Sequence, residues 1–267
     1  MVEARSQGRL ARAHPAGARI TERDRDLLAF LALHKLALRT HVEALLDVST
    51  DVARTRLRAL AGEGLLTQRK VFDRQPACIQ ITRKGLAVIA SELPTPRLDL
   101  RSYEHDVGLA WLWLAARAGT FGELREVHSE RQLRSHDLTP EGRADPFGVR
   151  LGGFGAGRRE RLHYPDLLLT DHGGHRIALE LELTGKGRVR REQILGGYAI
   201  DARVDAVVYF VPQPAVAREV RASAAKLGIS RLVHVQPVRS SPAYGGVENG
   251  AVAARARAPQ HDPQAAR

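Results

Sequence analysis

The chain has 267 residues, of which 43% are hydrophobic and 27% are charged, so it carries enough apolar side chain for more than one compact core. Lysine and arginine outnumber aspartate and glutamate by 41 to 30, and this excess favours a polyanionic partner such as nucleic acid. The single cysteine, Cys78, excludes an internal disulfide and argues against a cysteine-rich zinc site.

The two ends of the chain differ in composition from the middle. Residues 1–20 carry basic side chains without a continuous apolar run, which argues against a signal peptide, and we predict a disordered basic arm there. Residues 240–267, rich in alanine, arginine and proline, are predicted to be a disordered tail. No stretch approaches the roughly 20 apolar residues of a membrane span, so we expect a cytoplasmic protein with no membrane partner.

Three short helical patterns follow one another early in the chain. Thr21 followed by Asp24 predicts a capped amphipathic helix, and the segment Thr40–Glu43 matches a capping box for a second helix. Ser49 or Thr50 then caps a third helix that runs to about Gly62. Three short helices with tight joints are typical of a helix-turn-helix.

Two alternating segments follow these helices. The stretches LLTQRKVFD and CIQIT predict two strands, joined by a turn at Arg74-Gln75-Pro76. Thr82 then caps a further helix that the prolines Pro94 and Pro96 terminate. The whole order predicts a winged helix-turn-helix over residues 21–97.

The third helix has one apolar side and one basic side. At about 100° per residue, Val52, Ala53, Leu57 and Leu60 face the core, while Arg54, Thr55 and Arg58 face solvent and Arg56 lies nearer the apolar edge. In such domains this helix and the wing meet the major groove and the adjacent phosphates of double-stranded DNA. The predicted DNA-binding residues are Arg54, Arg58, Arg69, Lys70, Arg74, Arg83 and Lys84. The alternative is a solvated basic face with no ligand.

From Tyr103 onward the pattern becomes mixed. It predicts a helix, a strand over about 123–134, a glycine-rich stretch, two strands joined by His172-Gly-Gly-His175, and then helix, strand, helix and strand. We therefore predict a mixed α/β domain over residues 98–239, and an α+β fold for the chain as a whole. Trp111 and Trp113 are interpreted as core or domain-interface residues.

Three carboxylates mark the two strands around the glycine pair. Glu180 and Glu182 lie two apart and share a face, whereas Asp166 shares it only if the connecting loop has three residues or a bulge shifts the ladder. We predict that register, with the carboxylates on a hydrated concave surface where they raise a proton affinity or bind a divalent cation such as Mg²⁺. The alternative is an ordinary edge strand with a wet face. His163, His172 and His175 lack metalloprotease spacing and are interpreted as turn or surface residues.

The order of elements, with Pro165-Asp166 and the segment Ile177–Glu182, resembles the PD-(D/E)xK nuclease-like fold. The lysine expected two residues after Glu180 is replaced by Glu182, and Lys186 could take its role. The resemblance implies Asp166 and Glu180 as metal ligands and Glu130 as an additional acid on the preceding strand. The catalytic candidates that it implies are Asp166, Glu180, Glu182, Lys186 and Gln193, with Tyr198 beside Gln193.

A winged helix followed by the block YPDLLL…IALELELTGK…R…GY resembles the plasmid replication-relaxation family of mobile genetic elements. The resemblance implies a DNA-binding accessory protein of plasmid replication, relaxation or conjugative transfer, acting beside a relaxase or another transfer protein. The alternatives are a magnesium-dependent DNA endonuclease, against which the missing lysine argues, and a winged-helix transcription regulator whose second domain senses a ligand or forms a homodimer.

Overall fold

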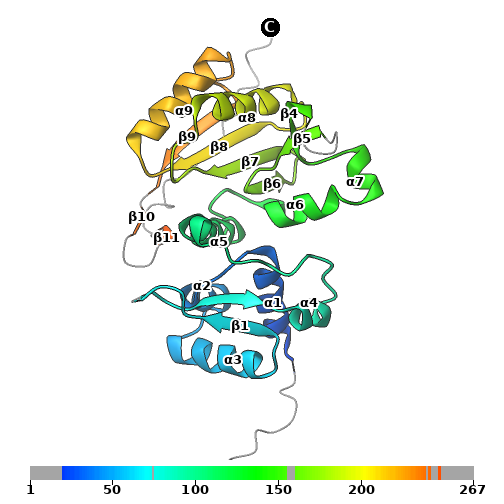
Figure 1. The fold of residues 1–267 in the computed structure, drawn as a ribbon, viewed down its shortest axis with the longest axis vertical. Coiled ribbons are helices and arrows are strands. Elements are labelled where there is room, and N and C mark those ends of the chain that lie inside the picture. Colours follow the sequence, from blue (N-terminus) through cyan, green and yellow to red (C-terminus); the bar gives the residue numbers. More distant parts are fainter. Residues whose placement is uncertain (1–19, 74, 155–159, 239, 242–245, 248–267) are drawn as a thin grey trace, which may run out of the picture.

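A computed structural model describes residues 20–73, 75–154, 160–238, 240–241 and 246–247. These residues form a mixed α+β fold, as the sequence predicts (Figure 1). The predicted basic arm up to residue 19, the wing residue Arg74 and most of the predicted tail lie outside the described residues. Within them, no helix is both long enough and apolar enough to cross a membrane.

The first part of the chain consists of helices and one hairpin. Its elements are α1 (Glu22–Leu33), α2 (Arg39–Leu46), α3 (Thr50–Gly62), β1 (Leu66–Arg69), β2 (Cys78–Ile81) and α4 (Arg83–Val88), with β1 and β2 antiparallel. The predicted capping box of α1 is present, because Thr21 accepts from the Asp24 N–H and the Asp24 carboxylate accepts from the Thr21 N–H. Thr82 caps α4 by accepting from the Gly85 N–H.

The start of α2 differs from the prediction. Thr40 lies inside the helix, and the residue before the first turn is Leu38, whose N–H donates to Nδ1 of His41 at 2.8 Å. Glu43 forms an ion pair with Arg39 at 3.2 Å instead of capping the helix. A histidine ring nitrogen thus takes the place of the predicted carboxylate acceptor, because His41 is buried against the start of its own helix.

The second part of the chain is built on a five-stranded sheet of order β3-β6-β7-β8-β9. Strands β3, β6 and β7 are antiparallel neighbours, and β7, β8 and β9 are parallel neighbours. Helix α5 covers one face, and α8 and α9 cover the other (Figure 1). The elements are η1 (Leu100–Ser102), α5 (Tyr103–Arg117), β3 (Leu124–Ser129), α6 (Glu130–His136), α7 (Pro140–Ala144), β4 (Val149–Phe154), β5 (Glu160–His163), β6 (Leu167–Asp171), β7 (Arg176–Leu181), α8 (Arg188–Ile200), β8 (Ala206–Val211), α9 (Pro214–Lys226) and β9 (Val233–Pro237).

Two predicted segments are corrected. The strand predicted over 123–134 ends at Ser129, whose hydroxyl accepts from the Gln132 N–H and caps α6, so Glu130 begins a helix and is not on the strand. The predicted disordered tail contains two short paired strands, β10 (Ser240–Ser241) and β11 (Gly246–Val247), and β11 lies beside α5.

The register of the β6–β7 hairpin agrees with the prediction. Leu167 pairs with Leu179 and Thr170 with Arg176, and the Asp171 N–H donates to the His175 carbonyl, which leaves a three-residue loop. Continuing this ladder by one residue sets Asp166 opposite Glu180. The pairing that brings the two carboxylates to the same end of the sheet is therefore the observed one.

The two parts of the chain share one hydrophobic core across the predicted boundary at residue 97. The ring of Phe30 on α1 lies 5.4 Å from that of Trp113 on α5, and the ring of His41 lies 4.5 Å from that of Trp111. The guanidinium of Arg131 donates to the Ala32 carbonyl at 3.0 Å. The interpretation of both tryptophans as core or interface residues is confirmed.

Candidate functional site

The outer face of α3 carries an exposed group of cationic side chains. Arg54 and Arg58 are exposed with Thr55, whereas Ala53, Leu57 and Leu60 are buried against α1 and the hairpin. Val52 was predicted to face the core but is 54% exposed, because the packed side of α3 begins only at Ala53. The arginine pair predicted from the helical period is on the solvent side.

Arg56 fixes this helix from the inside. Its guanidinium makes a bidentate ion pair with the carboxylate of Asp24, which is only 2% exposed and also caps α1. Burial alone would raise the pKa of Asp24, but the hydrogen bonds from Arg56 and Thr21 hold it below its usual value. Arg56 therefore links α3 to the first turn of α1 instead of belonging to the exposed face.

The remaining predicted cations lie on the hairpin and α4. Arg69, Lys70, Arg83 and Lys84 are exposed, and Lys84 Nζ donates to the Glu63 carbonyl at 2.7 Å. Two of the basic side chains have close acidic neighbours, Arg54 with Asp51 at 3.0 Å and Lys70 with Asp73 at 3.2 Å. Exposed pairs of this kind contribute little free energy, so these charges can exchange a carboxylate for a phosphate.

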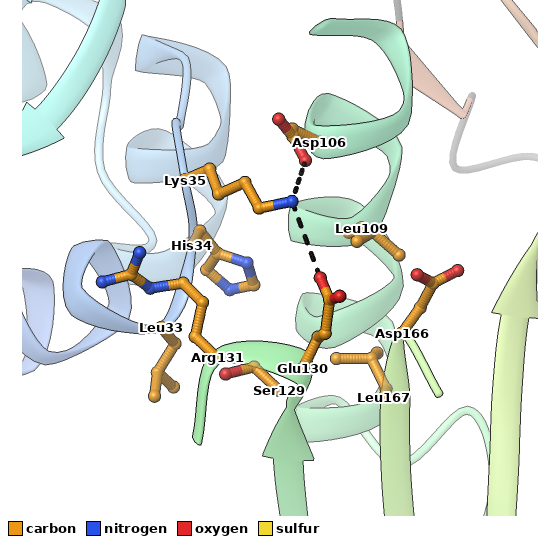
Figure 2. A pocket seen from close by; sticks show the side chains of 10 residues that line it. All are labelled: Leu33, His34, Lys35, Asp106, Leu109, Ser129, Glu130, Arg131, Asp166 and Leu167. Carbon is orange, nitrogen blue, oxygen red and sulfur yellow. Dashed lines mark ion pairs between the residues drawn. The ribbon is translucent and has the colours of Figure 1, made fainter. Parts of the chain in front are cut away.

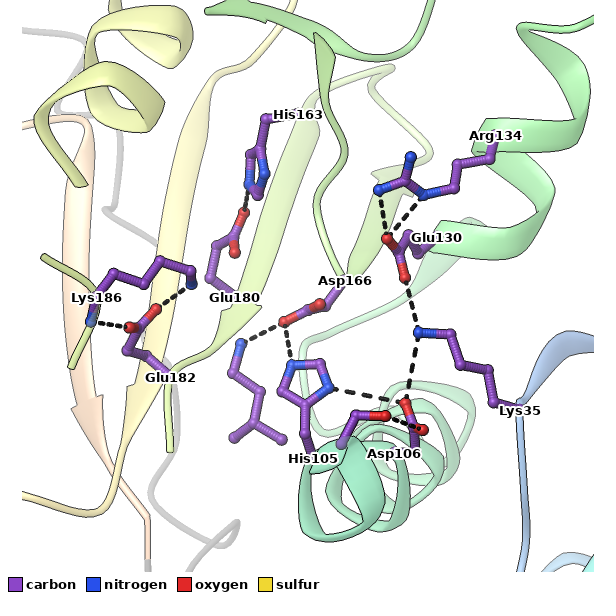
Figure 3. A network of polar contacts seen from close by, with 12 residues as sticks. Lys35, His105, Asp106, Glu130, Arg134, His163, Asp166, Glu180, Glu182 and Lys186 are labelled. Atoms are coloured by element: carbon purple, nitrogen blue, oxygen red, sulfur yellow. Dashed lines mark hydrogen bonds and ion pairs between the residues drawn. The ribbon is translucent and has the colours of Figure 1, made fainter. Parts of the chain in front are cut away.

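A second candidate site lies where β6 starts and β7 ends, at one end of the sheet (Figure 3). Asp166, Glu180 and Glu182 are all found there, and each has a histidine or lysine partner of its own. The Asp166 carboxylate accepts from the Leu181 N–H at 2.7 Å and lies 3.2 Å from Nε2 of His105 on α5. Burial alone would lower the pKa of His105, but Asp166 and Asp106 raise it to about 10, so the ring is an imidazolium at neutral pH.

Glu180 is the most enclosed of the three carboxylates, with 1% of its surface exposed. It lies 2.6 Å from Nε2 of His163 on β5 and accepts from the Tyr198 hydroxyl of α8 at 2.5 Å. Burial alone would raise the pKa of Glu180, but His163, Lys186 and Tyr198 together lower it. The predicted hydrated surface is therefore wrong, because helix α8 and strand β5 cover Glu180, and Glu182 is buried beside it.

Lys186 reaches back to this cluster past Gly185. Its N–H donates to the Glu182 carboxylate at 2.8 Å, and its ammonium group pairs with the same carboxylate. Burial alone would lower the pKa of Lys186, but the charges of Glu180 and Glu182 raise it. Gln193 lies half-buried on α8, and of the predicted glutamine-tyrosine pair only Tyr198 hydrogen-bonds to the cluster among the described residues.

Carboxylate oxygens are the ligands that Mg²⁺ prefers, so the residue types suit a magnesium site. The arrangement does not. Asp166 pairs with His105, Glu182 pairs with Lys186, and Glu180 is in contact with the His163 ring and the Tyr198 hydroxyl. In the described part of the chain no group of three or more histidine, cysteine, aspartate or glutamate side chains is placed to hold a metal ion. The predicted ligand pair Asp166 and Glu180 therefore does not fit a metal ion as it stands.

A line of charges connects this cluster to the first part of the chain (Figure 3). Asp106 lies next to His105 and 3.7 Å from the Lys35 ammonium, which lies 3.6 Å from Glu130. Beside this line is a cavity of about 20 Å³, lined in part by His34, Lys35 and Asp166 and wide enough for one water molecule (Figure 2). Glu130 thus belongs to the junction between the two parts of the chain rather than to the carboxylate cluster.

Sequence reasoning missed His105 and His163 as members of the cluster. The interpretation of His163 as a turn or surface residue is wrong, since its side chain is only 13% exposed. The available signals were the position of His105 between Glu104 and Asp106 at the start of the α5 segment, and the position of His163 three residues before Asp166. Neither reveals which carboxylate the ring pairs with, because that depends on how α5 and β5 pack around the sheet.

No protein-family model and no curated protein matches this chain. The resemblances to the replication-relaxation family and to the PD-(D/E)xK fold therefore stay predictions that rest on the motifs themselves.

Proposed function

We propose that this chain is a DNA-binding protein in which residues 21–97 act as a winged helix-turn-helix. The observation that carries the proposal is the outer face of α3, where Arg54 and Arg58 point to solvent from a helix that Arg56 holds rigidly against α1. A recognition helix enters the major groove with its exposed face toward the DNA, while its other face packs against the rest of the domain.

In this proposal α3 lies in the groove and the hairpin lies along the backbone. Arg54 and Arg58 contact base edges or phosphates, since a guanidinium suits both guanine and phosphate oxygens. Arg69 and Lys70 on the hairpin, with Arg83 and Lys84 at the start of α4, contact the flanking phosphates. The excess of positive charge over the chain supports the same partner.

The biological setting follows from the predicted family. We propose accessory work in plasmid replication, relaxation or transfer, in which the part after residue 97 supports assembly beside a relaxase. The carboxylate cluster supports a structural role for that part, because each of the three carboxylates already has a side-chain partner: His105 for Asp166, His163 for Glu180 and Lys186 for Glu182.

The test is a binding selection with the full chain. A random duplex library is enriched on the protein, and the affinity for the selected sequence is compared with that for a scrambled duplex at several salt concentrations. A preference for the selected duplex, with affinity that falls as salt rises, supports the proposal. Equal and salt-independent affinity for both duplexes contradicts it.

One observation favours a second candidate, a magnesium-dependent endonuclease. Lys186 places a positive group beside Glu182, at the cluster where the resemblance expects the catalytic lysine. A supercoiled plasmid incubated with the protein and Mg²⁺ tests it. Nicking that disappears in Asp166→Ala establishes this candidate, and an intact plasmid with both proteins rejects it.

A further inference from the structure

A groove of about 810 Å³ lies between the first turn of α8 and the length of α9, beside the carboxylate cluster, with which it shares Lys186. It follows from the topology, because β7 and β8 are parallel neighbours and both are followed by helices on the same face of the sheet. The two strand-to-helix connections therefore leave the sheet at the same end. Outside the carboxyl ends of neighbouring parallel strands is where open α/β sheets bind their ligands.

The lining of the groove is positively charged. Three cationic side chains, Arg188, Arg191 and Lys226, face the carboxylates of Glu192 and Glu219, which leaves an excess of one positive charge. Lys186 also lines the groove, but its ammonium group pairs with Glu182 in the carboxylate cluster. Such a balance favours an anionic ligand.

Arg191 is the fixed element of this lining. Its side chain is 7% exposed, its Nε donates to Ser223 Oγ at 3.0 Å, and its Nη1 donates to the Lys186 carbonyl at 2.8 Å and to Glu219 at 2.9 Å. Among the described residues its Nη2 makes no hydrogen bond. A guanidinium held in one orientation with a donor to spare is well suited to a phosphate oxygen.

The backbone at the mouth of the groove adds further donors. The N-cap of α8 is Gly187, and no side chain caps either α8 or α9 by a hydrogen bond. The first N–H groups of α8 are thus left for a ligand, with the partial positive charge of the helix end behind them. A Cβ on Gly187 would meet no atom within 4 Å, so the approach to this turn is open.

We propose that this groove binds the phosphate groups of a nucleotide. Its volume is within the range of small-molecule sites, and the exposed side chains of Ala215 and Ala222 give it an apolar wall beside the cations. A free nucleotide and the end of a nucleic-acid strand present the same phosphate chemistry. This site is separate from the α3 surface and does not depend on the DNA-binding function proposed above.

Calorimetric titration of the full chain tests the proposal with three probes: ATP, inorganic pyrophosphate and a 5′-phosphorylated single-stranded oligonucleotide. The test variant is Arg188→Glu, whose side chain lines the groove and is 75% exposed. Its matched control is Arg218→Glu, an exposed arginine of α9 that does not line the groove. We expect one site for ATP, weakened at least tenfold by Arg188→Glu and unchanged by Arg218→Glu.

The outcomes separate the sources of the phosphate. Binding of ATP and pyrophosphate identifies a free nucleotide, whereas binding of the oligonucleotide alone, weakened by Arg188→Glu, identifies a strand end. Ala222→Glu, which adds a carboxylate to the wall, should weaken the same probe, and Arg54→Ala with Arg58→Ala should leave ATP binding unchanged. No binding of any probe, or an equal loss in Arg188→Glu and Arg218→Glu, overturns the proposal.

Discussion

His105 on α5 and Asp166 at the start of β6 lie 3.2 Å apart as an ion pair. The same helix packs Trp113 against Phe30 of α1. Helix α5 therefore supplies both the interface with the first part of the chain and the counter-ion of a carboxylate in the second. The two candidate sites are joined by one rigid element, so a change in how α1 packs on α5 changes the position of His105.

Replacing Arg54 and Arg58 with alanine should weaken binding to the selected duplex by about 1 to 3 kcal/mol for each contact that reads a base. Both side chains are exposed on the outer face of α3, so the fold should be unaffected. Fluorescence anisotropy at fixed salt measures the change, with Arg218→Ala on α9 as the control. Unchanged affinity in the double variant would remove α3 from the proposed interface.

Replacing Arg69 and Lys70 on the hairpin with alanine should reduce affinity for all duplexes alike. Side chains that bind phosphate act through counterion release, so removing each of them should lower the slope of log affinity against log salt by about 0.9. The slope is measured on the selected and the scrambled duplex. If only the selected duplex binds more weakly, the hairpin reads bases instead of phosphates.

Stability should fall with acid because of His34 and His41. Burial, together with like charges near His34, lowers the pKa of both rings from 6.5 to about 3. The unfolded chain binds these protons first, so their contribution is complete above pH 6.5 and is lost as pH falls toward 3. At pH 5 the loss is about 2 kcal/mol for each histidine.

Denaturant unfolding between pH 7.5 and pH 5 measures this loss, and His34→Phe tests its origin. The phenyl ring keeps the aromatic packing against Phe30 and Trp113 but cannot be protonated. The free energy of unfolding of this variant should depend less on pH than that of the original chain. An identical pH dependence would assign the acid sensitivity to other groups.

Local sequence signals predicted most elements, because caps and periodicity act over a few residues. Thr21 with Asp24 predicted the start of α1. The glycine pair left two registers open for the hairpin, and the one that we predicted, with a three-residue loop, is observed. The cap of α2 was missed because a buried histidine replaced the expected carboxylate, and Glu130 was misplaced because Ser129 both ends β3 and caps α6.

The candidate site was predicted only in part, because some of its contacts join residues that are far apart in the sequence. The three carboxylates and Lys186, the partner of Glu182, are close in sequence and were found, but the partners of Asp166 and Glu180 come from α5, β5 and α8. His105 precedes Asp166 by 61 residues. No local sequence pattern shows that a side chain of helix α5 packs against the Asp166 carboxylate. Without these partners the carboxylates alone predict a metal site.

Removing the two histidines should convert the cluster into a site that responds to divalent cations. In a chain with His105→Ala and His163→Ala, Asp166 keeps the hydrogen bond from the Leu181 N–H and Glu180 keeps that from the Tyr198 hydroxyl. Both carboxylates then lack their histidine partners, and breaking a buried ion pair such as that of Asp166 with His105 costs about 3 to 5 kcal/mol. We expect lower stability in chelator and recovery in millimolar Mg²⁺ or Mn²⁺, because a hard cation can take the place of the lost partners. Thermal unfolding with and without the metal measures this recovery.

His175→Ala is the matched control. His175 also pairs with a carboxylate, that of Asp171 at 2.9 Å, but this pair lies on the exposed hairpin loop. The response of this variant to metal should therefore equal that of the original chain. If the metal stabilises the original chain as strongly as the double variant, His105 and His163 do not exclude a cation from the cluster. That result would favour the endonuclease candidate and contradict a purely structural role for the cluster.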